Sequence, residues 1–535
     1  MDYSQWTLRQ KIGQLIVVRA SGFLFDHQIR YPQWEAPNER LKAWLSTLNL
    51  GGVILLGGSA VELAQRTQQL QGWATTPLLL CADIEEGVGQ RFTGATWFPP
   101  PMALGDIAKQ DLTLACDYAR RMGEVTAQEA LAIGLNWVLA PIADVNNNPE
   151  NPVINVRAFG ETPEIVRALV QAFIAGAKSY PVLTTAKHFP GHGDTATDSH
   201  LHLPVIPHSA ERLAQVELPP FQGAIAAGVD TVMTAHLQIP VWDDQHPATL
   251  SPGILTGQLR EKLGFEGLIV TDALIMGGIT QGTTPEEVAI RALEAGADIL
   301  LMPPDPVQAI DAIAQAVTTG RLTTARIDQS LQKIYQAKSH LSLLGQPPAP
   351  MALEQLSLPT ARATVQAILQ TSLKTGGNLP LPVTTTASQN SFTNLIIVDD
   401  LLNSDFLDRA CPSVKIPRDR GYQVQLVDQN SLGLLPLPSH PTLLQGVVRG
   451  NPFRGIAGLT PEAQTFYQAW LKHPLLQGLM LYGSPYVLGW FLPQFSADFP
   501  WVFSFGQMPQ AQAIACQTLF GLAEDVPQVK EAFTN

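Results

Sequence analysis

Residues 267–305, GLIVTDALIMGGITQGTTPEEVAIRALEAGADILLMPPD, contain the pattern from which the fold of this chain is predicted. A short apolar run beginning at Leu268 ends in Thr-Asp, and a second apolar run begins at Ile299. Between them, Thr-Pro-Glu at 284–286 offers an N-cap, a proline for the first helical position and an acidic first turn, which together predict the start of a helix. A buried strand, a helix and another buried strand are typical of a parallel sheet with crossover helices.

The same unit recurs through the first 305 residues. Eight apolar runs of this kind begin near Leu15, Val53, Leu78, Leu135, Val182, Thr231, Leu268 and Ile299. Another Thr-Pro-Glu helix start stands at 162–164, followed by Ile165, Leu169, Ala172 and Phe173 on one predicted face. Eight such units favour a (β/α)8 barrel of the TIM type over residues 1–345, although periodicity alone also allows an open, doubly wound sheet.

The chain changes character after residue 345. GQPPAP breaks the helical pattern, and we predict a helical segment and linker over 346–390, with a helix at about 353–374 and then a stretch rich in glycine, proline and hydroxyl residues. Five shorter strand candidates follow, at 395–398, 423–427, 443–448, 478–482 and 501–505. The prediction is therefore an α/β protein in which the barrel is followed by a smaller αβα sandwich domain over 391–535.

Composition excludes several classes of function. The 535 residues are 45% hydrophobic and 15% charged, and 46 acidic against 33 basic residues give a net charge of −13, which repels nucleic acids and anionic membrane surfaces. The four cysteines form no C-x-x-C pair, which favours a reducing compartment. The N-terminus lacks the pattern of a signal peptide, and no apolar stretch reaches about 18 residues. We expect a cytoplasmic protein without membrane insertion.

Polar residues follow most of the predicted barrel strands. In a parallel barrel these positions form the active site. Taken singly, each residue is equally well explained as a helix cap or an ion-pair partner, but their recurrence at equivalent strand ends favours a shared site. They are Asp83, Asp144, Arg157, Lys187, His188, His236 and Asp272.

The densest candidate is the loop KHFPGHGDTATDSH at 187–200. Its three histidines and two aspartates allow a metal site, but the spacing matches no usual zinc pattern and Lys187 would add a cation beside the ion. The other interpretation pairs Asp198 with His200, since a carboxylate bonded to an imidazole orients it for general acid/base work. The second interpretation is favoured, and neither a metal nor a cofactor is predicted.

These motifs resemble glycoside hydrolase family 3, in particular the two-domain bacterial β-N-acetylglucosaminidases of peptidoglycan recycling. The loop at 187–200 is similar to that group's K-H-F-P-G-H-G-x4-D-S-H signature, and GLIVTDALIMGGI is similar to the nucleophile strand. ADIEEGVGQRF at 82–92 resembles D-x-E-G-G-x-V-x-R, and NPVINVRAFG at 151–160 resembles N-P-V-I-x-x-R-x-F-G. The likeness covers the whole predicted barrel and, more faintly, the second domain.

The resemblance implies a retaining, exo-acting enzyme that hydrolyses terminal β-linked N-acetylglucosamine, a small-molecule or oligosaccharide substrate, from peptidoglycan fragments. It implies Asp272 as nucleophile and His200, oriented by Asp198, as acid/base; this histidine departs from the usual pair of carboxylates. The residues implied to hold the sugar are Asp83, Arg91, Arg157, Lys187 and His188. Three alternatives stay open: a phosphorylase of the same family, a metal-dependent hydrolase, and a non-catalytic sugar-binding barrel.

One stretch departs from the family pattern. Glu86 stands where the first glycine of D-x-E-G-G is usual, and Val88 with Gly89 replaces a basic residue and a valine. Glycine allows close backbone approach, so we expect the Glu86 side chain to narrow the sugar pocket or to alter what lies beyond it. This departure bears on the shape of the subsites and leaves the reaction type unchanged.

Overall fold

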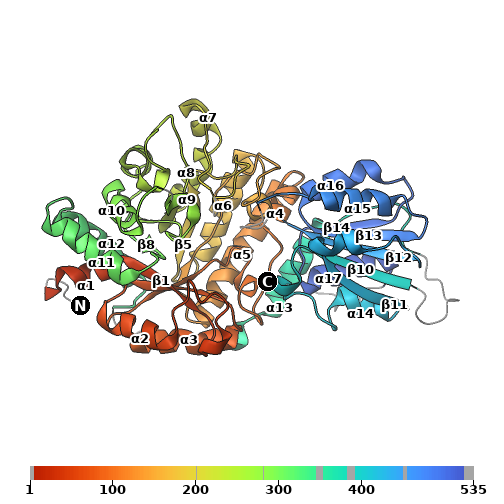
Figure 1. The fold of residues 1–535 in the computed structure, drawn as a ribbon, viewed down its shortest axis with the longest axis horizontal. Helices are drawn as coiled ribbons and strands as arrows, with labels where there is room; N and C mark the ends of the chain where they lie inside the picture. Colours follow the sequence, from red (N-terminus) through yellow and green to blue (C-terminus); the bar gives the residue numbers. More distant parts are fainter. Residues whose placement is uncertain are drawn as a thin grey trace.

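A computed structural model describes residues 5–199, 202–280, 282–344, 353–381, 392–449 and 455–522. Two parts lie at opposite ends of the longest axis (Figure 1). The larger part, coloured red to green, is built from the N-terminal residues, and the smaller part, mostly blue, from the C-terminal residues.

Eight parallel strands form the larger part, in the order β7-β6-β5-β4-β3-β2-β1-β8. A parallel bridge between Val270 and Ile299 joins the two end strands, so the sheet closes into a barrel. Every strand predicted in this region is present, and the open-sheet alternative is wrong. Strands β1 to β8 are Ile16–Ser21, Gly52–Leu56, Leu79–Ala82, Trp137–Val138, Leu183–Phe189, Thr231–Thr234, Leu268–Val270 and Leu300–Leu301.

Helices surround the barrel strands, and the predicted helix starts are confirmed. Thr162 is the N-cap of α6, in which Leu169 and Phe173 are buried. The Thr284 hydroxyl accepts the Glu287 N–H at 3.3 Å at the start of α10. Helices α1 to α12 are Leu8–Gly13, Asn38–Thr47, Ala60–Trp73, Met102–Ala108, Leu112–Ala132, Pro163–Ala177, Ala210–Gln215, Leu218–Ala226, Gly277–Thr280, Pro285–Ala295, Pro306–Thr318 and Thr324–His340. The 3-10 helices η2 to η5 are Asp26–Gln28, Val88–Gln90, Asn155–Arg157 and Ala248–Leu250, and η6 is a π-helix over Gly253–Lys262.

The smaller part contains a six-stranded sheet in the order β11-β10-β12-β13-β14-β9. The five predicted strands are present and parallel to one another. Strand β9 was not predicted, and it pairs antiparallel with β14 at the edge of the sheet. Strands β9 to β14 are Lys374–Gly376, Phe392–Val398, Tyr422–Asp428, Thr442–Val448, Leu476–Gly483 and Trp501–Ser504.

The helices of the smaller part flank this sheet (Figure 1). Helices α13 to α17 are Pro359–Thr371, Pro412–Arg418, Pro461–Leu471, Pro485–Phe491 and Pro509–Phe520, and the 3-10 helices η7 to η10 are Leu353–Gln355, Leu401–Asn403, Gln429–Leu434 and Leu492–Gln494. Within the described part of the chain, no helix combines the length and the apolar character needed to cross a bilayer.

The two parts pack directly against each other. Helix α13 contacts α4 and α5 of the barrel, and one hydrophobic cluster continues from the barrel into the second domain. Lys374 of β9 forms a 2.8 Å ion pair with Asp106 of α4, and the Tyr486 hydroxyl lies 2.9 Å from the Asn146 amide nitrogen. The predicted domain boundaries at 345 and 391 stay predictions.

Candidate active site

A cleft of about 1880 Å³ lies between the mouth of the barrel and the second domain. Six of the eight predicted site residues line it: Asp83, Arg91, Arg157, Lys187, His188 and Asp272. They come together because the carboxyl ends of all eight strands of a parallel barrel open on the same face. The second domain lines the opposite side of the cleft with residues that include Arg449.

Glu85 is the centre of a buried network of charges in the cleft. Arg157 donates two hydrogen bonds of 2.8 Å to its carboxylate, and Lys187 Nζ lies 2.7 Å from Glu85 Oε1. Burial by itself raises the pKa of Glu85, but Arg157 and Lys187 outweigh burial and hold that pKa well below its ordinary value. Burial lowers the pKa of Lys187, and the carboxylates of Asp83 and Glu85 more than compensate, so its pKa is raised. Glu85, Arg157 and Lys187 therefore stay charged at neutral pH.

Asp83 and Arg91 complete this network at its solvent side. Lys187 Nζ lies 2.6 Å from Asp83 Oδ1, whose side chain is 36% exposed to the cleft. Arg91 Nε donates a 3.0 Å hydrogen bond to the Asp83 backbone carbonyl. The result is a row of charged donors and acceptors whose positions are set before any ligand binds, which suits recognition of sugar hydroxyl and amide groups.

Asp144 anchors a second group of side chains, which includes two histidines. His188 Nδ1 donates to Asp144 Oδ2 at 2.8 Å, while Asp144 Oδ1 accepts the backbone N–H groups of His188 and His192. Burial tends to raise the pKa of Asp144, but His188 and these hydrogen bonds lower it overall. Because Nδ1 is engaged, His188 has Nε2 left for a ligand in the cleft.

Asp272 follows β7 and lines the same cleft. Its Oδ1 atom accepts the Ala273 N–H at 2.7 Å, and its side chain is partly exposed. His236, at the end of β6, is buried and lies 3.2 Å from the Ala273 carbonyl through Nε2 and 2.8 Å from the Thr249 hydroxyl through Nδ1. His236 therefore supports the turn that carries Asp272.

The predicted acid/base pair is described in part. His200 lies outside the described residues, so its pairing with Asp198 stays a prediction. Asp198 is buried, and Ser199 lines the cleft. His192 Nε2 lies 2.8 Å from the Ser199 hydroxyl within the loop, and the His192 backbone N–H ties the loop to the barrel by donating to Asp144 at 2.7 Å. Burial lowers the pKa of His192 to about 4, so this histidine is neutral at physiological pH.

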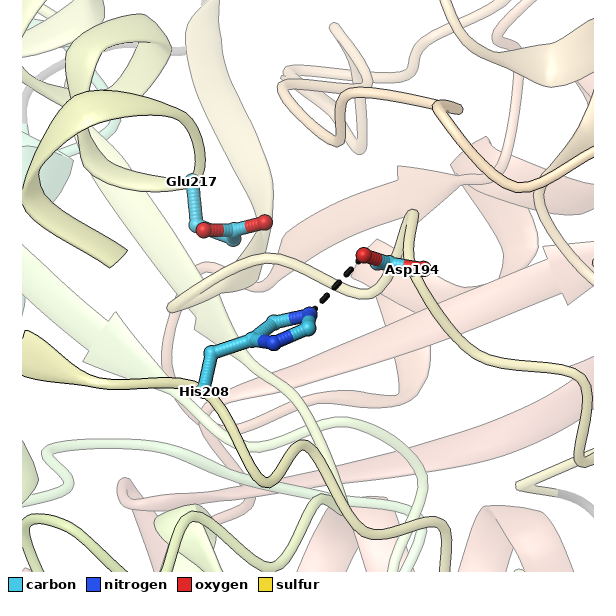
Figure 2. Close-up of side chains that lie close together, drawn as sticks. All are labelled: Asp194, His208 and Glu217. Atoms are coloured by element: carbon cyan, nitrogen blue, oxygen red, sulfur yellow. Dashed lines mark hydrogen bonds and ion pairs between the residues drawn. The ribbon is translucent and has the colours of Figure 1, made fainter. Parts of the chain in front are cut away.

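Asp194 lies on the same loop in a group whose composition resembles a metal site. Figure 2 shows Asp194, His208 and Glu217 close together. Each offers one possible ligand atom, and these atoms lie within 4.8 Å of one another. Arg212 already supplies a cation there, because it donates to both Glu217 oxygens at 2.8 and 2.9 Å and lies 3.3 Å from Asp194. His208 Nε2 lies 2.8 Å from Asp194. The group is a salt-bridge cluster that attaches the loop to the barrel.

The side chain of Glu86 points toward the second domain. It is fully buried, its Oε1 atom lies 2.6 Å from Arg449 Nη2, and its Oε2 atom accepts the Trp97 indole N–H at 2.9 Å. The expectation that Glu86 narrows the sugar pocket is therefore wrong. The alternative expectation, that Glu86 alters what lies beyond the pocket, agrees with its contact to Arg449.

Sequence reasoning named Asp144 among the polar residues at the strand ends but gave it no role, and it did not include Glu85 or Arg449. Glu85 had a usable signal, since it lies three residues beyond the end of strand β3. Arg449 had none, because it follows β12 of the second domain and reaches the cleft through the docking of the two parts.

Comparison with known proteins places this geometry in a family. The model of the glycosyl hydrolase family 3 N-terminal domain matches residues 7–337, and that of the bacterial glycosyl hydrolase family 3 C-terminal domain matches residues 385–521. A solved structure of a family 3 β-N-acetylglucosaminidase from Paenibacillus sp. str. FPU-7 is similar over 96% of this chain and 97% of that chain, with a TM-score of 0.77 and 28% identity.

Two curated relatives are also similar in sequence. A β-hexosaminidase A from Pseudoalteromonas piscicida is 34% identical over 377 residues, which are 64% of this chain and 62% of the relative. A β-N-acetylglucosaminidase/β-glucosidase from Cellulomonas fimi is 31% identical over 351 residues, 63% of this chain and 61% of the relative. The chain thus spans less than two thirds of the length of either relative.

Proposed function

The chain belongs to glycosyl hydrolase family 3, and we propose that it is a retaining, exo-acting β-N-acetylglucosaminidase, a β-N-acetylhexosaminidase in the broader classification. The observation that carries the proposal is the preformed network of Asp83, Glu85, Arg157 and Lys187 in the same cleft as Asp272. The names of the β-hexosaminidase A and of the solved family 3 β-N-acetylglucosaminidase support the amino-sugar specificity.

In the proposed reaction, the Asp272 carboxylate attacks the anomeric carbon of the terminal sugar. The bond to the leaving oxygen breaks as His200, oriented by Asp198, donates a proton to that oxygen, and a covalent glycosyl-enzyme forms. Water then attacks the anomeric carbon, His200 takes its proton, and Asp272 is released. The partly exposed position of Asp272 in the cleft supports its role as nucleophile.

The network around Glu85 would hold the sugar during both steps. Lys187 and Arg157 are permanent donors, and Asp83 is an acceptor with its carboxylate open to the cleft. His188 offers Nε2, since its Nδ1 is held by Asp144. We assign the sugar hydroxyls and the 2-acetamido group to these residues together with Arg91.

The proposed natural substrate is a peptidoglycan fragment that ends in β-linked N-acetylglucosamine, processed in the cytoplasm. The support is the match of the loop at 187–200 to the recycling branch of the family. The four cysteines are free thiols, and Cys81, Cys411 and Cys516 are buried, which agrees with a reducing compartment.

A direct substrate comparison tests the proposal. We expect kcat/KM for p-nitrophenyl N-acetylglucosaminide to exceed that for the glucoside by about 10⁴-fold, because donors and acceptors placed for the acetamido group stay unpaired when it is absent. Reactions with and without inorganic phosphate distinguish hydrolysis from phosphorolysis. We expect free N-acetylglucosamine as the product under both conditions. A faster reaction with the glucoside, or release of the sugar 1-phosphate, would refute the proposed activity.

A further inference from the structure

The contact between Glu86 and Arg449 joins the two domains at the sugar-binding segment. Glu86 is fully buried and Arg449 is 9% exposed. Arg449 Nη2 lies 2.6 Å from Glu86 Oε1. Removal of Arg449 would leave the Glu86 carboxylate buried without this counter-ion, which is costly in a protein interior. The ion pair therefore fixes the loop that carries Glu86 relative to the end of the strand that precedes Arg449.

Glu86 lies at the base of a compact loop, residues 83–98. Its backbone N–H donates to the Gln90 side chain at 3.0 Å, its carbonyl accepts the backbone N–H of Phe98 at 2.8 Å, and its carboxylate accepts the indole N–H of Trp97. At Gly89 a side chain would collide with the backbone of residues 95 and 96, at 2.4 and 2.6 Å. The loop thus folds back on itself around Glu86, and Arg449 holds it from outside.

Arg449 lies at the carboxyl end of strand β12 in the second domain. Strands β10 and β12 are neighbours, while β11 lies on the other side of β10, so the chain direction across the sheet reverses between β10 and β12. In open parallel sheets, the crevice at the carboxyl ends of such strands is the usual binding position. Arg449 directly follows β12 at this crevice. In this protein the Glu86 carboxylate, which belongs to the barrel, contacts Arg449 at this crevice.

Glu86 is covalently adjacent to Glu85, the residue that holds Arg157 and Lys187. Any shift of Glu86 would therefore move the acceptor that positions both cations. We propose that Arg449 is a positioning residue for sugar binding, which acts through Glu86 to hold residues 83–98 and hence Glu85 in place. The role in sugar binding rests on the proposed function. The statement that Arg449 holds residues 83–98 in place does not depend on it.

The pair also limits what Arg449 does in the cleft. Its charge is balanced by Glu86, so Arg449 is not free to attract an anionic leaving group. Its loss should weaken sugar binding without changing the demand for protonation of the leaving oxygen. That pattern differs from the loss of an acid/base residue, which affects poor leaving groups most.

Hydrogen exchange tests the structural content of the proposal without any substrate. We expect Arg449→Met to speed amide exchange in peptides that cover 83–98. Lys374→Gln removes a different interdomain ion pair, with Asp106, and should leave exchange of these peptides unchanged. If Arg449→Met has little folded protein, Arg449→Gln, which also removes the cation, is judged by the same criterion. Unchanged exchange over 83–98 in a folded Arg449 variant would overturn the proposal.

Kinetics test the functional content. In Arg449→Met, kcat/KM for p-nitrophenyl N-acetylglucosaminide should fall about 10- to 100-fold, largely through KM, and equally for good and poor leaving groups. The double variant Glu86→Gln/Arg449→Gln should lose no more than the worse of its two single variants, because the pair acts as a unit. Additive losses, or a loss confined to poor leaving groups, would refute the positioning role. Failure of the wild type to cleave N-acetylglucosaminides would refute the proposed function and leave the exchange test intact.

Discussion

Lys187 Nζ lies 2.7 Å from the Glu85 carboxylate, and the two side chains are only 1% and 2% exposed. Such a pair is costly to bury unless its hydrogen bonds are complete. Here Glu85 also binds Arg157 through both oxygens, and Lys187 also binds Asp83. The cleft therefore holds charged groups at fixed positions without a ligand, which is the arrangement that binding and electrostatic catalysis require.

Replacement of Glu85 tests this network. Glu85→Gln leaves Arg157 and Lys187 buried without their shared carboxylate, so the free energy of unfolding should fall by about 3 kcal/mol. Urea unfolding followed by tryptophan fluorescence measures the change. Glu124→Gln, which removes an exposed ion pair with Arg120, should have little effect. Equal stability of the two variants would show that the network is not a stabilising unit.

The neutral state of His192 predicts a dependence of stability on pH. An unfolded histidine takes up a proton near pH 6.5, whereas burial lowers the folded pKa of His192 to about 4. Between these values the unfolded state binds more protons, so the contribution of His192 is complete above pH 6.5 and declines as pH falls toward 4. His192→Gln should reduce the slope in this window by up to about 1.4 kcal/mol per pH unit.

The control for this prediction is His340→Gln, at an exposed position. Its unfolding free energy should follow that of the wild type from pH 7 to pH 4. A wild-type profile that is flat between pH 6.5 and 4.5 would contradict the assignment of a buried, neutral His192.

The acid/base role of His200 predicts a dependence on the leaving group. His200→Ala should reduce hydrolysis of N-acetylglucosaminides with poor leaving groups far more than that of activated aryl glycosides, since only the former need a proton as the bond breaks. Asp198→Asn should act in the same direction but more weakly, through the orientation of the imidazole. The measurement is the ratio of the two losses in kcat/KM. Equal losses would assign His200 to sugar binding.

Chelation tests the metal interpretation of the histidine loop. Arg212 forms ion pairs with both Asp194 and Glu217, and proton transfer is assigned to His200. Activity should therefore survive prolonged dialysis against EDTA. Activity that is lost with EDTA and restored by zinc would support a metal-dependent hydrolase.

The barrel was predictable because its signals are local. Each strand is a short apolar run, and helices such as α6 begin at a Thr-Pro-Glu sequence that has its effect within one turn. Strand β9 carried no such signal, because Lys374–Gly376 is three residues long and part of a glycine-rich stretch. Its strand conformation comes from pairing with β14, more than 120 positions away along the chain.

The site was predictable to the extent that it depends on strand ends. Asp83, Lys187 and Asp272 could be named because each lies at the end of a barrel strand, and the barrel brings those ends together. The contact of Glu86 with Arg449 joins residues 363 positions apart and depends on how the two domains dock. No local pattern reports such docking, so the sequence left open whether Glu86 narrows the sugar pocket or alters what lies beyond it.

Trapping of the covalent intermediate tests the central claim most directly. A 5-fluoro-N-acetylglucosaminyl fluoride forms a long-lived glycosyl-enzyme with retaining enzymes that accept this sugar. After tryptic digestion, mass spectrometry should find the sugar on peptide 263–291, with fragmentation assigning it to Asp272 and not to Glu266, Glu286 or Glu287, and Asp272→Ala should show no label. A label on another residue, or turnover in the wild type without any trapped intermediate, would contradict the account.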